Sequence, residues 1–173
     1  STTKGVDYAA QGKFKEANEE FARALKVDPS FGPAKRASKV MKDVSDQKIE
    51  SQTAVHYFKG ISYAIKGQYD QAISHYNQAI EINPTFANAY ISRGVAYAQS
   101  RGQYDQAISD FSKAIEISPQ FAKAYKDRGF AYYKKGQYDQ AFSDYSKAIE
   151  INQRFADAYF NRAVLRLEDG DLE

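Results

Sequence analysis

Small and aromatic side chains recur along this chain at helical spacing. An aromatic or imidazole side chain is followed four residues later by glycine or alanine, and in most copies three residues further on by tyrosine. Offsets of four and seven place side chains on one face of a helix. The first residues of this pattern are 34, 35 and 34 residues apart: His56, Tyr90, Tyr125 and Tyr159. The pattern therefore predicts a repeated unit that opens with a helix.

A second helix is expected after a glycine turn in each unit. The run GQYDQA begins at three positions and a degraded copy, GKFKEA, at a fourth: Gly67, Gly102, Gly136 and Gly12. After the tyrosine of each full run, alanine, an aromatic residue and alanine follow on one helical face. Proline then ends the helix at Pro29, Pro84 and Pro119, and Gln153 in the last unit weakens this stop without abolishing it.

Each unit is a helix, a tight turn and a second helix, with small residues facing aromatic ones. This unit resembles the repeat of the tetratricopeptide repeat family. The resemblance covers residues 5–29 and 53–173. It implies an all-α fold, a right-handed superhelical solenoid of stacked antiparallel helix pairs with a concave groove.

The units divide the chain into six segments. We expect a truncated first repeat, an irregular helical insert, a repeat, a repeat with a one-residue insertion, a further repeat, and the first helix of an incomplete one: 1–31, 32–52, 53–86, 87–121, 122–155 and 156–173. Ser1 stands where an opening aromatic residue belongs, and Gly170 begins a turn whose second helix is missing. We therefore expect a fragment of a longer protein, or an array with incomplete end caps.

Two stretches depart from the pattern. One extra residue lies between Tyr97 and Gly102, which predicts a longer first helix or a bulged turn. Segment 32–52 carries one apolar stripe that ends at Val44, and a polar stretch follows. It predicts a helix, an interruption near Ser45 and Asp46, and a new helix before Val55; a single helix through to Lys66 is the alternative.

Charge and composition exclude several classes of function. The formal net charge of +2 gives no bulk electrostatic reason to bind nucleic acid or an anionic membrane. No apolar run approaches the roughly 20 residues of a membrane span, and there is no signal-peptide pattern. Cysteine is absent, which fits any compartment. We expect a cytoplasmic location, although the compartment stays open.

Signatures of catalysis are missing from the sequence. The chain has two histidines and no cysteine, and no phosphate loop, nucleophile elbow or paired-histidine motif. His56 occupies the opening aromatic column and is interpreted as a packing residue. His75 stands where the other units have Asp110 and Asp144. We expect no enzyme activity, no metal site and no cofactor.

A second apolar stripe runs beside the packing face of the first helices, one residue after each packing position. A helix that is apolar on two adjacent faces must bury more than its own pairing requires. In the resembling family this stripe lines the concave surface, so the resemblance implies a groove for a protein or peptide ligand. The stripe and its polar neighbours give the candidate binding residues: Tyr57, Ile61, Ile91, Val95, Lys126, Phe130, Tyr133, Phe160 and Val164, with Asn88, Lys123 and Asn161.

The groove chemistry indicates an apolar or amphipathic ligand. Some members of the resembling family grip the carboxylate end of chaperone tails with lysine, arginine and asparagine. This chain offers Lys126 and Asn161, but Phe130 stands where an asparagine is expected. Arg93 and Arg128 should instead form half-exposed salt bridges within their units, to Asp110 and Asp144, and no function should depend on them.

The sequence favours a non-catalytic adaptor that holds a segment of another protein in its groove. One alternative is a self-assembling scaffold, a homo-oligomer formed through segment 32–52 or the open array ends. Another is an accessory module of an enzyme whose catalytic domain lies elsewhere. An RNA-reading repeat of the pentatricopeptide type is disfavoured by the nearly neutral charge.

Overall fold

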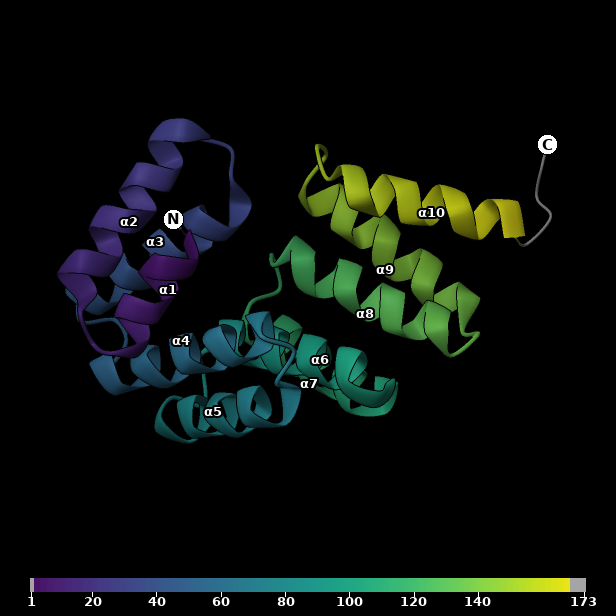
Figure 1. Ribbon diagram of the computed structural model, residues 1–173. Coiled ribbons are helices and arrows are strands. Elements are labelled where there is room, and N and C mark those ends of the chain that lie inside the picture. Colours follow the sequence, from purple (N-terminus) through teal and green to yellow (C-terminus); the bar gives the residue numbers. More distant parts are fainter. Residues whose placement is uncertain (1, 169–173) are drawn as a thin grey trace. The chain divides into compact units, whose positions relative to one another are not determined.

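The computed structural model describes residues 2–168, and there the chain forms α-helices joined by short turns (Figure 1). The predicted turn at Gly170 lies outside the described residues. Within them, ten helices follow in order: α1 (Thr2–Ala10), α2 (Phe14–Val27), α3 (Gly32–Ser45), α4 (Ser51–Ile65), α5 (Tyr69–Ile82), α6 (Ala87–Arg101), α7 (Tyr104–Ile117), α8 (Ala122–Lys134), α9 (Tyr138–Ile151) and α10 (Ala156–Glu168). The all-α fold of helix pairs is confirmed. None of the described helices is both long and apolar enough to cross a membrane.

The chain divides into two compact units, Ser1–Ala89 and Tyr90–Glu173. In the first unit, α1 packs on α2 and on α4, α4 packs on α5, and α3 packs on α2. In the second unit, α8 packs on α7 and α9, and α10 packs on α9 and α8. Helix α6 begins in the first unit and continues into the second.

The turn glycines end the first helices by a defined hydrogen-bond pattern. Gly67 has φ 73° and donates its N–H to the carbonyl of Ala64 at 3.0 Å, while Gln68 donates to the carbonyl of Tyr63 at 3.0 Å. This is a Schellman motif, which places its glycine in the left-handed region. Gly12 and Gly136 end α1 and α8 in the same way.

The one-residue insertion lengthens α6 and widens its turn. Helix α6 runs to Arg101, directly before Gly102, whereas a non-helical Lys135 separates α8 from Gly136. Gln103 donates its N–H to the carbonyl of Tyr97 at 3.2 Å, six residues back instead of five. The predicted longer first helix is therefore present.

Side-chain caps end the second helices together with proline. The Asn83 side-chain oxygen accepts the N–H of Thr85 at 3.0 Å, next to Pro84. The Asn152 side-chain oxygen accepts the N–H of Arg154 at 3.1 Å in the unit without the proline. Helix α9 still ends at Ile151, so the weakened stop holds, as expected, because the asparagine turn competes with the helix.

Segment 32–52 contains helix α3, a break and the first two residues of α4. Helix α3 ends at Ser45 and α4 begins at Ser51, with Gln47 at φ 57° between them. The interrupted helix is confirmed, and the alternative of one helix through to Lys66 is wrong. Ala37, Val40 and Met41 are buried. The apolar stripe of this segment is therefore used within the first unit.

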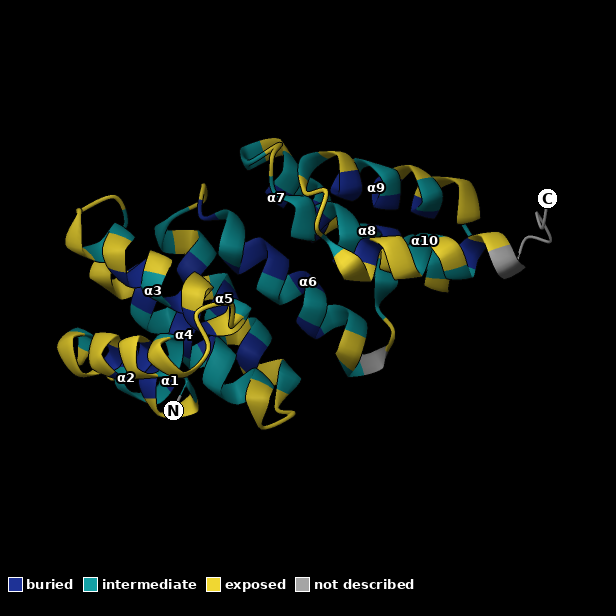
Figure 2. Ribbon diagram, turned by 90° about the horizontal axis from the view of Figure 1, so that it is seen from above, coloured by how far each residue is buried: buried dark blue, intermediate teal, exposed yellow. Residues whose placement is uncertain are grey.

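Each helix pair closes where a glycine faces an aromatic ring. A Cβ atom added to Gly60 would lie 2.4 Å from the ring of Tyr76, nearer than any real contact. The same contact joins Gly5 to Phe21, Gly94 to Phe111 and Gly129 to Tyr145. These rings are at most 2% exposed, and Figure 2 shows buried and exposed residues side by side along α2 and α9, whereas α6 is buried or intermediate except near its end. The absence of a side chain at these positions sets how closely the two helices approach.

We expect Gly60→Ala to lower the free energy of unfolding by about 1–3 kcal/mol, because the added methyl overlaps the Tyr76 ring. In a helix interior without such an overlap, replacing glycine with alanine stabilises the protein by up to about 1 kcal/mol. The sign of the change in unfolding free energy therefore shows whether the overlap occurs. Urea unfolding followed by circular dichroism measures it.

Gly32→Ala is the matched control, since its added Cβ would meet only the flexible guanidinium of Arg36, at 3.2 Å. It should change stability by no more than about 0.5 kcal/mol. An unchanged or raised stability of Gly60→Ala would show that α4 and α5 can move apart freely.

Candidate functional site

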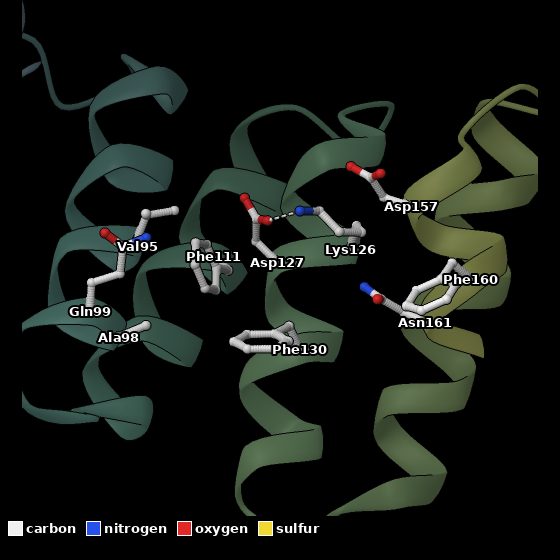
Figure 3. A pocket seen from close by; sticks show the side chains of 10 residues that line it. All are labelled: Val95, Ala98, Gln99, Phe111, Lys126, Asp127, Phe130, Asp157, Phe160 and Asn161. Atoms are coloured by element: carbon white, nitrogen blue, oxygen red, sulfur yellow. Dashed lines mark ion pairs between the residues drawn. The ribbon is translucent and has the colours of Figure 1, made fainter. Parts of the chain in front are cut away.

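A cavity of about 380 Å³ lies in the second unit. Helices α6, α8 and α10 form its walls, and α7 contributes one ring (Figure 3). We call it the second-unit groove. Its lining residues are Val95, Ala98, Gln99, Phe111, Lys126, Asp127, Phe130, Asp157, Phe160 and Asn161.

Two phenylalanines in the groove are exposed to solvent. Phe130 on α8 is 41% exposed, and Phe160 on α10 is 69% exposed. The ammonium group of Lys134 lies 5.3 Å from the centre of the Phe130 ring and covers part of it. Exposed apolar side chains that converge on one cavity are typical of an interaction site.

Two lysines in or beside the groove form ion pairs with an aspartate that lines it. Asp127 forms ion pairs with Lys126, at 2.7 Å between nitrogen and oxygen, and with Lys123. The Asp127 side chain is only 10% exposed, so a largely buried carboxylate is the partner of both lysines. Asp157 on α10 also lines the groove and is exposed. Lys126, Asp127 and Asp157 are the charged residues that line the groove, and their charges sum to −1; Lys123 and Lys134 lie beside it.

Five of the candidate residues from the sequence come together in this cavity: Val95, Lys126, Phe130, Phe160 and Asn161. Tyr133 and Val164 do not line it. The Tyr133 ring lies 5.8 Å from that of Tyr138 and packs against the core around Tyr145. Lys123 reaches the site only through its ion pair with Asp127.

The remaining candidates lie elsewhere. Tyr57 is 6% exposed, and its ring lies 5.1 Å from Phe86 in an edge-to-face contact. Ile91 is 4% exposed. Both side chains have too little surface to anchor a ligand. Ile61 and Asn88 belong to the first unit, so a wall continuous from them into the second-unit groove stays a prediction.

The groove also contains residues outside the candidate set. Ala98 belongs to the second apolar stripe, and Gln99, Asp127 and Asp157 are polar residues beside it on the same first helices, so the repeat pattern already indicated these positions. Phe111 gives no such signal, because it occupies a packing column and is 1% exposed.

Comparison with known families identifies the repeat. A family model described as TPR repeat, the tetratricopeptide repeat, matches residues 60–100, 100–136 and 129–170, more than half of the chain. The chain belongs to the TPR family.

Relatives and solved structures show the same repeat. A TPR repeat-containing thioredoxin TDX from Oryza sativa subsp. japonica is 35% identical over 75 residues, which cover 43% of this chain. The match spans only 23% of the length of that curated relative. The first TPR of Spaghetti (RPAP3) bound to HSP90 peptide SRMEEVD has a TM-score of 0.68 at 24% identity, over 70% of this chain and 96% of that one. The Arabidopsis OM64 TPR domain has a TM-score of 0.64 at 28% identity, over 66% and 94%.

The expected arginine–aspartate pairs are present in this TPR chain. Arg93 donates to both carboxylate oxygens of Asp110, at 2.8 and 2.6 Å, and Arg128 makes the same bidentate pair with Asp144 at 2.8 Å. The arginine side chains are only 18% and 19% exposed and the aspartates 7%. The predicted half exposure is wrong, because both partners lie between paired helices. Burial raises the pKa of Asp110, and the hydrogen bonds that Arg93 donates to Asp110 raise the pKa of Arg93.

Arg128 also links adjacent repeats. Its second terminal nitrogen donates to the hydroxyl of Ser112 on α7 at 3.0 Å. One side chain on α8 therefore holds α7 and α9 at once. This geometry supports a structural role for the arginine.

Replacing Arg128 with alanine should lower the free energy of unfolding by roughly 3 kcal/mol, because it leaves the carboxylate of Asp144 buried without its partner. The double variant Arg128→Leu with Asp144→Leu should be markedly more stable than this single variant. Chemical unfolding of both proteins provides the measurement. A loss smaller than about 1 kcal/mol for Arg128→Ala would mean that the pair behaves as an exposed surface bridge.

The two histidines meet between α4 and α5. Their Nδ1 atoms are 3.3 Å apart, and the ring of His75 stacks on Tyr63 with the centroids 5.3 Å apart. Within residues 2–168, no cluster of three or more His, Cys, Asp or Glu side chains could hold a metal ion. Burial lowers the pKa of His56, and the neighbouring His75 and Lys59 add to this effect.

This shift predicts that stability falls in mild acid. Because the pKa of His56 is lowered from its ordinary value of 6.5, the unfolded chain binds the proton more tightly than the folded chain. The free energy of unfolding should therefore fall as the pH falls through and below that value.

His56→Tyr, which installs the tyrosine found at Tyr90 and Tyr125, should remove part of this pH dependence. Unfolding free energies of both proteins between about pH 7.5 and about pH 5.5 test it. Equal losses in the two proteins would show that other groups cause the dependence.

Proposed function

We propose that this TPR chain is a non-catalytic interaction scaffold whose second-unit groove binds an apolar or amphipathic segment of a partner protein. The observation that carries the proposal is the exposure of Phe130 and Phe160 in one cavity. Burying a fully exposed phenylalanine is worth about 1.5–3 kcal/mol, and Phe130 and Phe160 would each gain the share of this that corresponds to their exposed surface. With Val95 and the stem of Lys126 as further contacts, micromolar affinity is within reach after the cost of association.

The charges of the groove argue against a ligand that binds through carboxylates. The Spaghetti TPR is bound to an acidic peptide, and the resemblance implies an asparagine where this chain has Phe130. Here Lys123 and Lys126 already pair with Asp127, and Asp157 adds a further negative charge. An acidic tail would have to displace Asp127, so an apolar segment fits better.

The groove holds no arrangement that we assign to catalysis. Its lysine is paired with Asp127, and neither histidine lines it. One second candidate has a specific observation in its favour, because the rice relative is named a thioredoxin. In that case the chain would be the accessory TPR module of a larger enzyme, and thiol chemistry would lie outside this cysteine-free sequence. The full coding sequence distinguishes the two.

A library of short synthetic peptides, selected against the full chain, tests the proposal. We expect enrichment of peptides with aromatic or long aliphatic residues, and at least roughly tenfold weaker binding of a selected peptide to Phe130→Ala with Phe160→Ala. Fluorescence anisotropy of the labelled peptide gives the affinity. The acidic peptide SRMEEVD serves as the comparison probe and should bind more weakly.

Tyr159→Ala is the matched control, since Tyr159 is 43% exposed on α10 but does not line the groove. It should bind the selected peptide like the parent. Equal affinity of the parent and the double phenylalanine variant would move the binding site away from the groove. Light scattering of the free chain tests self-assembly, because a monomer at every concentration excludes the scaffold built from copies of itself.

A further inference from the structure

A second cavity, of about 450 Å³, lies in the first unit and is polar. Lys59 and Ser62 on α4 line it, with Lys66 just after α4, His75 on α5, Asp7 on α1 and Gln11 just after α1. We call it the first-unit cavity. It shares no residue with the second-unit groove, so a role for this cavity is independent of the function proposed for that groove.

Comparison of the repeats shows that the first-unit cavity lacks a carboxylate that other copies have. In two copies, the arginine before the helix glycine binds an aspartate on the paired helix, as Arg93 binds Asp110. The equivalent residues of the α4–α5 pair are Lys59 and His75. In the α1–α2 pair, by contrast, Lys4 still lies 3.8 Å from a carboxylate oxygen of Glu20. Lys59 is half-buried, and within the described part of the chain it has no carboxylate partner. One cation has been kept at this position and its anion has been replaced by an imidazole.

The charges around the first-unit cavity leave an excess of positive charge. Asp7 is its single lining carboxylate, and it accepts a hydrogen bond from the hydroxyl of Ser62 at 2.9 Å. Lys59 on α4 and Lys66 just after it also line the cavity, and His75 adds a third basic group. A half-buried cation without a counter-charge is costly, and an anion that enters the cavity would relieve this cost.

His75 lines the cavity from α5 and contacts Gln78. Its Nδ1 atom lies 2.9 Å from the side-chain oxygen of Gln78, which can only accept, so Nδ1 carries a proton in this contact. An imidazolium ring in the lining of a cavity can donate a hydrogen bond to an anion.

We propose that the first-unit cavity binds an oxyanion, a carboxylate or a phosphate group, in the role that Asp110 and Asp144 fill in the other copies. Lys59 makes the ion pair, His75 donates a hydrogen bond in its protonated form, and Lys66 adds attraction at the edge. Binding is therefore coupled to proton uptake by the histidine pair. Asp7 on α1 opposes it and limits the affinity for highly charged ligands.

Proton NMR of the full chain tests the site directly, because the protein has only two histidines. Inorganic phosphate and acetate are titrated separately, in a buffer that contains neither. We expect saturable shifts of the ring C–H signals and a higher titration midpoint for the histidine pair with the bound anion. Phosphate alone would identify a phosphate site, and acetate alone a carboxylate site.

Three variants make the assignment specific. Lys59→Met should weaken binding by about tenfold, the loss of one charge-assisted hydrogen bond. Lys59→Arg keeps the charge and should retain binding. His75→Asp places a carboxylate beside Lys59, as in the other copies, and should abolish the anion-dependent shift of His56.

Lys15→Met is the control, since Lys15 is exposed on α2 and lies outside the cavity. Its affinity should equal that of the parent, and circular dichroism confirms that every variant is folded. The absence of a saturable shift with either anion would overturn the proposal. The same affinity for Lys59→Met and the parent, or lost binding in a folded Lys59→Arg, would overturn it as well.

Discussion

The close approach of two helices at a residue without a side chain is the constraint on which the rest of this structure depends. A ring on the second helix of each pair occupies the space above a glycine on the first, as Tyr76 does over Gly60. This contact fixes the distance and the rotation of the helices together. It thereby decides which faces of the first helix remain for other contacts, including the apolar stripe whose Val95, Phe130 and Phe160 line the second-unit groove.

The same offset in different repeats leads to different environments. Tyr57 and Phe160 both follow the opening aromatic position, yet Tyr57 packs beneath Phe86 while Phe160 is largely exposed. The repeat therefore supplies a set of apolar positions, and the neighbours in space determine which of them face solvent. The buried pairs of arginine and aspartate behave differently, because their environment does not change between repeats. They recur with nearly the same geometry in two copies.

Local signals made most of the fold predictable. The spacing of glycine and aromatic residues placed the helices, and the break after Ser45 followed from the loss of apolar residues. The groove was predictable only in part, because burial depends on contacts between distant segments. Nothing in the sequence shows that Tyr133 turns to Tyr138, or that Asp127 takes both nearby lysines. The low exposure of Arg93 and Arg128 likewise arises from helix pairing, which sequence separation alone does not report.

The longer turn at Gly102 shows where the architecture tolerates a change in length. Gly94 still meets the ring of Phe111 although one more residue separates them than separates Gly129 from Tyr145. The pairing of Arg93 with Asp110 is likewise retained across that extra residue. The bend absorbs the added backbone, and the helices on either side keep their phase. Such bends are therefore the natural places for inserted loops, by evolution or by engineering, since a graft there leaves the interior undisturbed.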